Sequence, residues 1–162
     1  MQSREISTFR EQKAQIAIEY ILIVGLLLSM ILIVYPYALK QNELNKALAA
    51  ARDGATYAIA LKGLGYKYTG METPAGVMKI DRLELVPAPK LDCVGEKYRI
   101  RVYVLAPSYI EENYGSAIGT EIRHYARSFI HYAFYGTYET GFSPIETDRY
   151  CFSIGYSISS YG

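Results

Sequence analysis

Tryptophan is absent from this sequence, and cysteine and histidine occur only twice each. Catalytic signatures are also missing, since the chain has no Gly-rich phosphate loop, no GxSxG nucleophile elbow and no HExxH zinc motif. With two histidines and no visible carboxylate pair, little is available for acid–base chemistry. We therefore expect a protein that is not an enzyme and has no catalytic residue, metal or cofactor.

An excess of either charge is lacking as well, because 17 Lys and Arg residues face 16 Asp and Glu residues. A protein without a global positive field has no general means of gathering phosphates, so nucleic acid is not an expected partner. The chain also has no Asn-x-Ser/Thr acceptor for a standard N-glycan. Partners are therefore expected to be recognised by shape and by burial of apolar surface.

The chain does contain one long apolar run. Residues Tyr20 to Leu39 include no charged residue, and about 20 helical residues suffice to cross the ~30 Å hydrocarbon core of a bilayer. Arg10 and Lys13 precede the run and are typical cytoplasmic anchors, so the amino end is expected inside the cell. The run is too long for an ordinary secretory signal, which predicts a membrane span that is retained.

Glu19 adjoins this run, where a carboxylate is expensive unless it reaches headgroup water or meets a counter-charge. The residues from Lys13 to Tyr20 read KAQIAIEY and lead directly into the apolar run. This pattern of basic residue, small residue, Gln, spaced Glu and aromatic resembles the class III signal peptide of archaeal type IV pilins. The resemblance is limited to this N-terminal part of the chain.

The resemblance implies that residues 1–14 are a cytoplasmic leader, which a prepilin peptidase removes by cutting between Ala14 and Gln15. Ala17 departs from the common form of the motif, which often has Ser there. Archaellins lack the Glu in the equivalent place, so Glu19 favours a pilus subunit over an archaellum subunit. Cleavage would remove three basic and two acidic residues and leave a mature chain with no formal net charge.

Glu19 also has a role that follows from electrostatics. A buried carboxylate needs an opposite charge or a proton, and a processed Gln15 would carry a new ammonium group. Pairing of these two groups between neighbouring subunits would fix their axial register, as a lone buried polar residue does in a coiled coil. The alternative is a Glu19 that only reaches the membrane interface of an uncleaved protein.

Helical periodicity continues beyond the apolar run, so a single long helix is expected over residues 15–62. Pro36 removes an amide donor and is expected to kink or loosen this helix. A stripe of small and apolar residues then faces the rest of the protein, and glycines starting at Gly63 end the helix. The stripe comprises Leu44, Ala47, Leu48, Ala51, Ala55, Ala58 and Ile59.

Residues 63–162 are expected to form an extracellular, β-rich head domain. Strands are predicted over residues 77–86, 97–105 and 147–159, with the first two paired and with a possible bulge at Gly155. Residues 120–135 have helical spacing and end at Gly136, although a Tyr-rich hairpin competes with this assignment. The predicted fold class is α+β, a long apolar helix packed on a small, mostly antiparallel sheet.

Cysteines and histidines complete the candidate sites. Cys93 and Cys151 lie at predicted neighbouring strands and can form a disulfide in an exported domain, or remain as buried free thiols. His124 and His131 are expected on the solvated face of the second helix. Glu121 and His124 have metal-binding spacing, but no partner carboxylates of similar patterning are visible, so a metal site is not expected.

Taken with the resemblance, these features predict a pilin that inserts in the membrane with its amino end inside and later joins an extracellular helical homo-oligomer. Besides the peptidase, the implied partners are a pilus assembly ATPase and its membrane platform, and adhesion is the expected role. A minor pilin or a membrane-anchored adhesin that uses the same export route is the alternative from another functional class.

Overall fold

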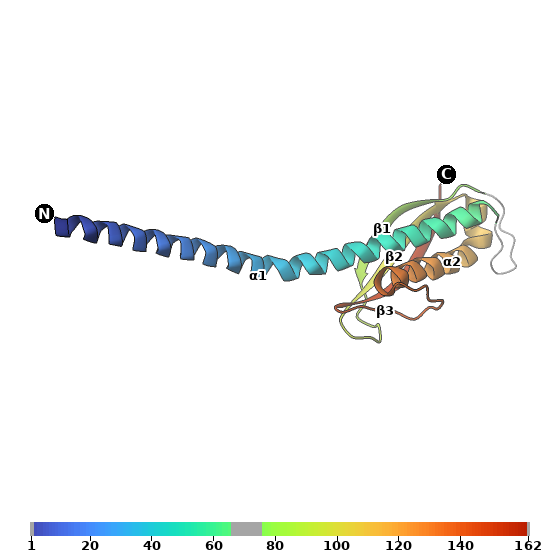
Figure 1. Ribbon diagram of the computed structural model, residues 1–162. Helices are drawn as coiled ribbons and strands as arrows, with labels where there is room; N and C mark the ends of the chain where they lie inside the picture. Colours follow the sequence, from blue (N-terminus) through green and yellow to red (C-terminus); the bar gives the residue numbers. More distant parts are fainter. Residues whose placement is uncertain (1, 66–75, 162) are drawn as a thin grey trace. The chain divides into compact units, whose positions relative to one another are not determined.

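The computed structural model describes residues 2–65 and 76–161, with side chains from residue 15 onward. Its elements are two helices and four strands (Figure 1): α1 (Gln2–Gly63), β1 (Lys79–Pro87), β2 (Glu96–Ala106), α2 (Ser108–Tyr135), β3 (Ile145–Glu146) and β4 (Tyr150–Ser160). The predicted α+β class, with a long N-terminal helix packed on a small sheet, is therefore confirmed.

The chain forms two compact units, Met1–Asn42 and Glu43–Gly162. We call the second the head unit. It includes the C-terminal part of α1, which ends where Gly65 takes a left-handed conformation with φ of 76° and donates its N–H to the carbonyl of Lys62. The predicted end of the helix at the glycines from Gly63 onward is confirmed, and the remaining part of that glycine-containing segment lies outside the described residues.

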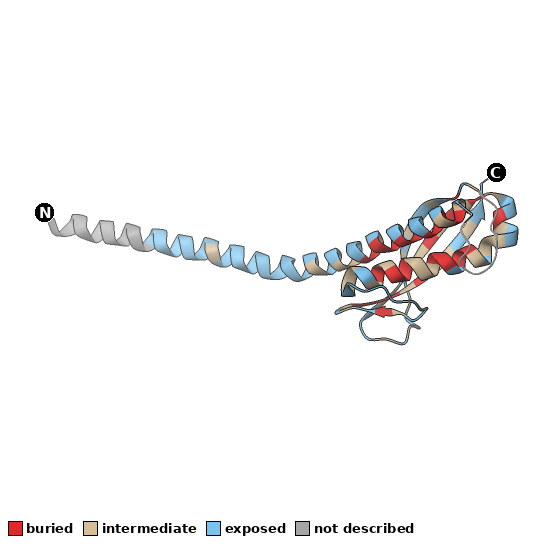
Figure 2. Cartoon of the chain, turned by 45° about the vertical axis from the view of Figure 1, so that its right-hand side comes forward, coloured by how far each residue is buried: buried red, intermediate tan, exposed pale blue. Residues whose placement is uncertain are grey.

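Within the head unit, α1 buries the predicted stripe. Ala47, Ala51 and Ala55 are fully buried, and Ala58 and Ile59 are nearly so, because 3.6 residues per turn bring these positions to one side of the helix. Figure 2 shows the buried positions of α1 and α2 in red. The small size of the buried alanines lets neighbouring elements approach α1 closely.

The sheet has the strand order β1-β2-β4-β3. The predicted pairing of β1 with β2 is confirmed and is antiparallel, as is the pairing of β3 with β4. The central pair, β2 and β4, is parallel, because α2 carries the chain back across the sheet before β4 begins. Two of the three pairs are thus antiparallel, in a sheet that is mixed overall.

Each central strand presents alternate residues to the core. Ile100, Val102 and Val104 of β2 are fully buried beside Phe152 and Ile154 of β4, and one hydrophobic cluster joins them to both helices. The opposite, outer face of the sheet carries the polar residues of the same strands. The predicted alternation in both strands is confirmed.

The predicted bulge at Gly155 is wrong. β4 pairs with β2 without a shift from Tyr150 to Ser160, and the register shift lies instead in β1, between Ile80 and Arg82. Gly155 is accounted for by a close approach: a Cβ atom there would lie 3.0 Å from Cδ of Arg99, whose side chain crosses the strand at this point.

The second helix begins twelve residues earlier than predicted, at Ser108, and the competing hairpin assignment is wrong. Gly115 and Gly119 lower the intrinsic helix propensity of this first half, but Ile110 and Ile118 are buried there and packing outweighs propensity. At the other end, Gly136 is left-handed and donates its N–H to the carbonyl of Tyr132, as the predicted cap requires.

α1 and α2 approach each other closely at Gly54, and this contact leads to a prediction. A Cβ atom at Gly54 would lie 2.5 Å from the backbone oxygen of Tyr125 and 2.7 Å from Cα of Ala126, so Gly54→Ala requires the helices to separate. We expect a loss of about 1–3 kcal/mol in the free energy of unfolding, as for other overpacked cores. Thermal and denaturant unfolding of the full chain in detergent micelles measures it.

The matched control is Gly115→Ala, also within a helix, where nothing lies within 4 Å of the added Cβ. Alanine has the higher helix propensity, so this variant is expected to be stabilised by up to about 1 kcal/mol. A Gly54→Ala protein as stable as Gly115→Ala would contradict the close helix contact.

Candidate assembly helix and head-unit surface

The candidate assembly site starts at the predicted N-terminus of the mature chain. Gln15 and Glu19 lie one turn apart on α1, and Nε2 of Gln15 donates to Oε1 of Glu19 over 3.2 Å. Both side chains are exposed. Lys13 and Ala14 belong to the helix but lie before the residues whose side chains are described. The carboxylate of Glu19 therefore faces outward at the border of an apolar surface.

That surface is formed by the apolar segment, which we define as Tyr20–Leu39. Its large side chains are mostly exposed, with Leu32 and Ile33 about three-quarters accessible. The hydroxyl of Ser29 donates to the carbonyl of Leu26 over 2.7 Å, so this polar group is satisfied inside the helix. Such an exposed apolar helix requires lipid or other protein around it.

Among the described residues, α1 contains one segment that is long and apolar enough to cross a membrane. The segment lies near the N-terminus, where both a membrane anchor and a signal sequence meet these criteria of length and composition. The helix continues through Pro36 without an interruption of its assignment. The kink or loosening predicted at this proline stays a prediction. Its physical basis is the missing amide donor, which leaves one carbonyl in the preceding turn without its helical partner.

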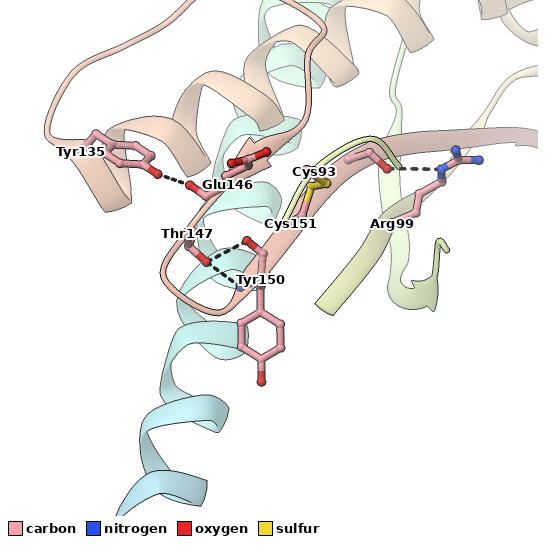
Figure 3. Close-up of a disulfide and its surroundings, with 8 residues drawn as sticks. Cys93, Arg99, Tyr135, Glu146, Thr147, Tyr150 and Cys151 are labelled. Carbon is pink, nitrogen blue, oxygen red and sulfur yellow. Dashed lines mark hydrogen bonds between the residues drawn. A yellow bond between two sulfur atoms is a disulfide. The ribbon is translucent and has the colours of Figure 1, made fainter. Parts of the chain in front are cut away.

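Where α1 enters the head unit, Glu43 connects it to the turn between β3 and β4. Oε2 of Glu43 lies 3.3 Å from Nη1 of Arg149, and its other carboxylate oxygen accepts a hydrogen bond from the hydroxyl of Thr147. Thr147 also caps the turn, because its Oγ1 accepts from the amide of Tyr150 over 3.1 Å (Figure 3). This carboxylate is largely buried, which strengthens its contacts.

A buried ion pair joins the end of α1 to α2. Nζ of Lys62 lies 2.7 Å from Oε1 of Glu121, and both side chains are at most 5% exposed. This pair was not predicted from the sequence, in which Glu121 stood out only for its metal-binding spacing from His124. The available signal was a charged residue on the apolar stripe of each helix, at positions where charge is costly without a partner.

Arg127 of α2 holds the following loop. Its guanidinium donates to the carbonyls of Ser143 and Glu139 and pairs with the Glu139 carboxylate at 3.0 Å, while Ser128 donates to the same Glu139 carbonyl. Nε2 of His131 lies 3.1 Å from that carboxylate, and the residue is half-buried. The predicted solvated position is therefore wrong for His131. In the described part of the chain, no cluster of ligating residues suited to a metal ion is present.

Cys93 and Cys151 form a disulfide (Figure 3), with Cα atoms 6.4 Å apart. The bond attaches the loop between β1 and β2 to β4, the neighbour of β2 in the sheet. In the chain-entropy description, a bridge over a separation of 58 residues stabilises the folded state by about 4 kcal/mol. A disulfide of this kind is typical of exported proteins.

The same loop forms one wall of a cavity on the outer face of the sheet, which we call the basic pocket. It has a volume of about 280 Å³ and is lined by residues 86–91 together with Arg99 and Arg101 of β2. Arg101 donates to the hydroxyl of Tyr103, and this hydrogen bond raises the pKa of Arg101 above its ordinary value. Arg101 therefore keeps its positive charge at all accessible pH values.

Comparison with protein-family models, curated proteins and solved structures finds no match. The arrangement of the chain is pilin-like in that a long apolar N-terminal helix packs, through its C-terminal part, on a small sheet.

Proposed function

We propose that this chain is a structural subunit of a type IV pilus-like surface filament of the archaeal kind. The observation that carries the proposal is the apolar segment, an exposed helical surface without charges that is bordered by Glu19. Before assembly, lipid covers this surface. In the filament, the same segments of neighbouring subunits cover one another, and the head units form the outer wall.

Processing completes the assembly site in this proposal. A prepilin peptidase cuts between Ala14 and Gln15, which creates an ammonium group one turn from Glu19. In a single subunit, Glu19 is already satisfied by the side chain of Gln15 at 3.2 Å, but that neutral contact does not compensate its charge. The ammonium group of a neighbouring subunit would compensate this charge, and the pairing would then set the register between subunits.

The head unit suits the outside of a cell. Its disulfide closes the loop before β2, and the contacts of Glu43 and the Lys62–Glu121 pair fasten α1 to the remainder of the fold. Export requires the chain to lie in the membrane with its amino end inside, and assembly then requires a motor ATPase and a membrane platform. The filament is expected to serve adhesion, and no catalytic role is proposed.

The decisive experiment is the intact mass and N-terminal sequence of the protein in material sheared from the cell surface. We expect an abundant chain that begins at Gln15 and carries the Cys93–Cys151 disulfide. A chain that begins at Met1 and stays with the membrane fraction would contradict the proposal and favour an anchored adhesin. A processed chain present in trace amounts would indicate a minor pilin in place of a major subunit.

A further inference from the structure

The basic pocket is a local concentration of positive charge on a chain whose formal charges otherwise nearly balance. Lys90, Arg99 and Arg101 all line it. Glu84 of β1 is the cross-strand neighbour of Arg101 and acts on its guanidinium as an opposite charge, besides accepting a hydrogen bond from Tyr103 over 2.7 Å. Arg99 donates to the hydroxyl of Ser153 and has no carboxylate partner in the described residues.

The pocket is attached to rigid elements, as a binding site requires. Arg99 and Arg101 project from β2, one of the two central strands, which is paired on both sides. The opposite wall contains Pro87 and Pro89, and its loop is fixed by the disulfide and by the hydrogen bond from the amide of Ala88 to the carbonyl of Lys97. Little conformational entropy is therefore lost when a ligand binds there.

Beside the pocket, the outer positions of β4 carry small residues, which we call the serine track: Ser153, Gly155, Ser157 and Ser159. Arg99 donates to the hydroxyl of Ser153, and Gly155 provides the space in which the Arg99 stem lies, so the track adjoins the pocket directly. Alternate residues of a strand repeat about every 6.6 Å along one face. The track thus presents a row of hydroxyl donors and acceptors next to two arginines.

We propose that the basic pocket and the serine track bind an acidic polysaccharide, with one sugar carboxylate held by Arg99 and Arg101. The planar guanidinium matches a carboxylate with two parallel hydrogen bonds, and the hydroxyls of the track match the hydroxyls of the sugar rings. The pocket is small and is lined by three cationic side chains. A protein that binds duplex DNA commonly contacts about 6–10 phosphates along an extended surface, so nucleic acid fits this pocket poorly. The proposal deepens the adhesive part of the proposed function by naming the polymer class.

The test measures binding of the full chain in detergent micelles to immobilised polygalacturonate, with neutral dextran, dextran sulfate and duplex DNA as comparison surfaces. We expect binding to polygalacturonate, weaker binding to dextran sulfate and none to the other two. The double variant Arg99→Gln/Arg101→Gln is expected to weaken binding to polygalacturonate by about tenfold or more. Near-UV circular dichroism checks that the variant is folded.

The matched control, Arg52→Gln/Lys79→Gln, removes two exposed positive charges elsewhere on the head unit and is expected to change the affinity less than about twofold. A second variant, Ser157→Glu, leaves both arginines intact and places a negative charge on the exposed track. It is expected to weaken binding as well, so the site can be tested even if the arginine variant does not fold.

Four results would overturn the proposal: no binding of the unmodified chain to polygalacturonate, undiminished binding by the arginine and Ser157→Glu variants, equal losses in the control variant, or equal or tighter binding to DNA or dextran sulfate. The measurement uses unassembled subunits, so its failure leaves the filament proposal standing. Conversely, a chain that proves to be uncleaved can still bind the polymer.

Discussion

Cells that produce Glu19→Ala are expected to make no surface filaments while retaining a normal amount of subunit in the membrane. The exposed carboxylate lies at the border of the apolar segment, bonded to Gln15 of its own helix. In the proposed filament, its partner would be the ammonium group of a neighbouring subunit. Removing the carboxylate leaves that ammonium uncompensated, at a cost of about 3–5 kcal/mol if it is fully buried.

A cost of this size lowers the association constant of each subunit contact by a factor of hundreds or more. We therefore expect a complete loss of filaments. Electron microscopy of cells, together with immunoblots of sheared and membrane fractions, measures it. Glu19→Gln separates charge from size, because the amide keeps the shape of the side chain. It is expected to fail like Glu19→Ala.

The matched control for this experiment is Ser29→Ala in the same apolar segment. The hydroxyl of Ser29 is satisfied by the carbonyl of Leu26 within the helix, and its removal leaves no buried charge behind. Ser29→Ala cells are expected to assemble normally. Normal filaments on Glu19→Ala cells would contradict the assembly role of Glu19. Absence of the subunit from the membrane fraction would indicate a defect in insertion.

The largest expected effect on stability comes from Lys62→Met. It removes one partner of the ion pair that lies between α1 and α2 and leaves the carboxylate of Glu121, which is 4% exposed, without its counter-charge. Breaking a buried pair in this way typically costs about 3–5 kcal/mol. Denaturant unfolding of the full chain in micelles, followed by the near-UV signal of its tyrosines, measures this loss.

The double variant Lys62→Met/Glu121→Leu replaces both charges with apolar groups and is expected to recover most of the lost stability, because neither ion then has to be desolvated. The control is Arg82→Met, which breaks an exposed pair with Asp81 and is expected to cost less than about 1 kcal/mol. If Lys62→Met costs no more than Arg82→Met, the buried pair does not hold the helices together.

Several elements of the fold could be predicted because their signals are local. The stripe from Leu44 to Ile59 has the period of a helix, and the alternation in β2 and β4 has the period of a strand with one buried face. Gly136 provides a left-handed cap, for which glycine is favoured. These predictions needed no knowledge of which elements lie side by side.

Other features could not be predicted from local signals. The first half of α2 contains two glycines and forms a helix because Ile110 and Ile118 are buried, which depends on the remainder of the fold. Gly155 was predicted to mark a bulge, but it accommodates the side chain of Arg99 on the neighbouring strand, which the sequence alone does not reveal. The same holds for the contacts of Arg127, which join α2 to a loop that follows it.

By itself, the sequence determined the long uncharged apolar segment, the position of Glu19 beside it and the α+β class, because hydrophobic period and length are properties of neighbouring residues. The tertiary structure alone decided that Lys62 meets Glu121, that β2 and β4 are parallel, and that Arg99 and Arg101 share a pocket with residues 86–91. These features depend on pairing between residues far apart in the chain, and their energies arise only once folding has removed water from between them.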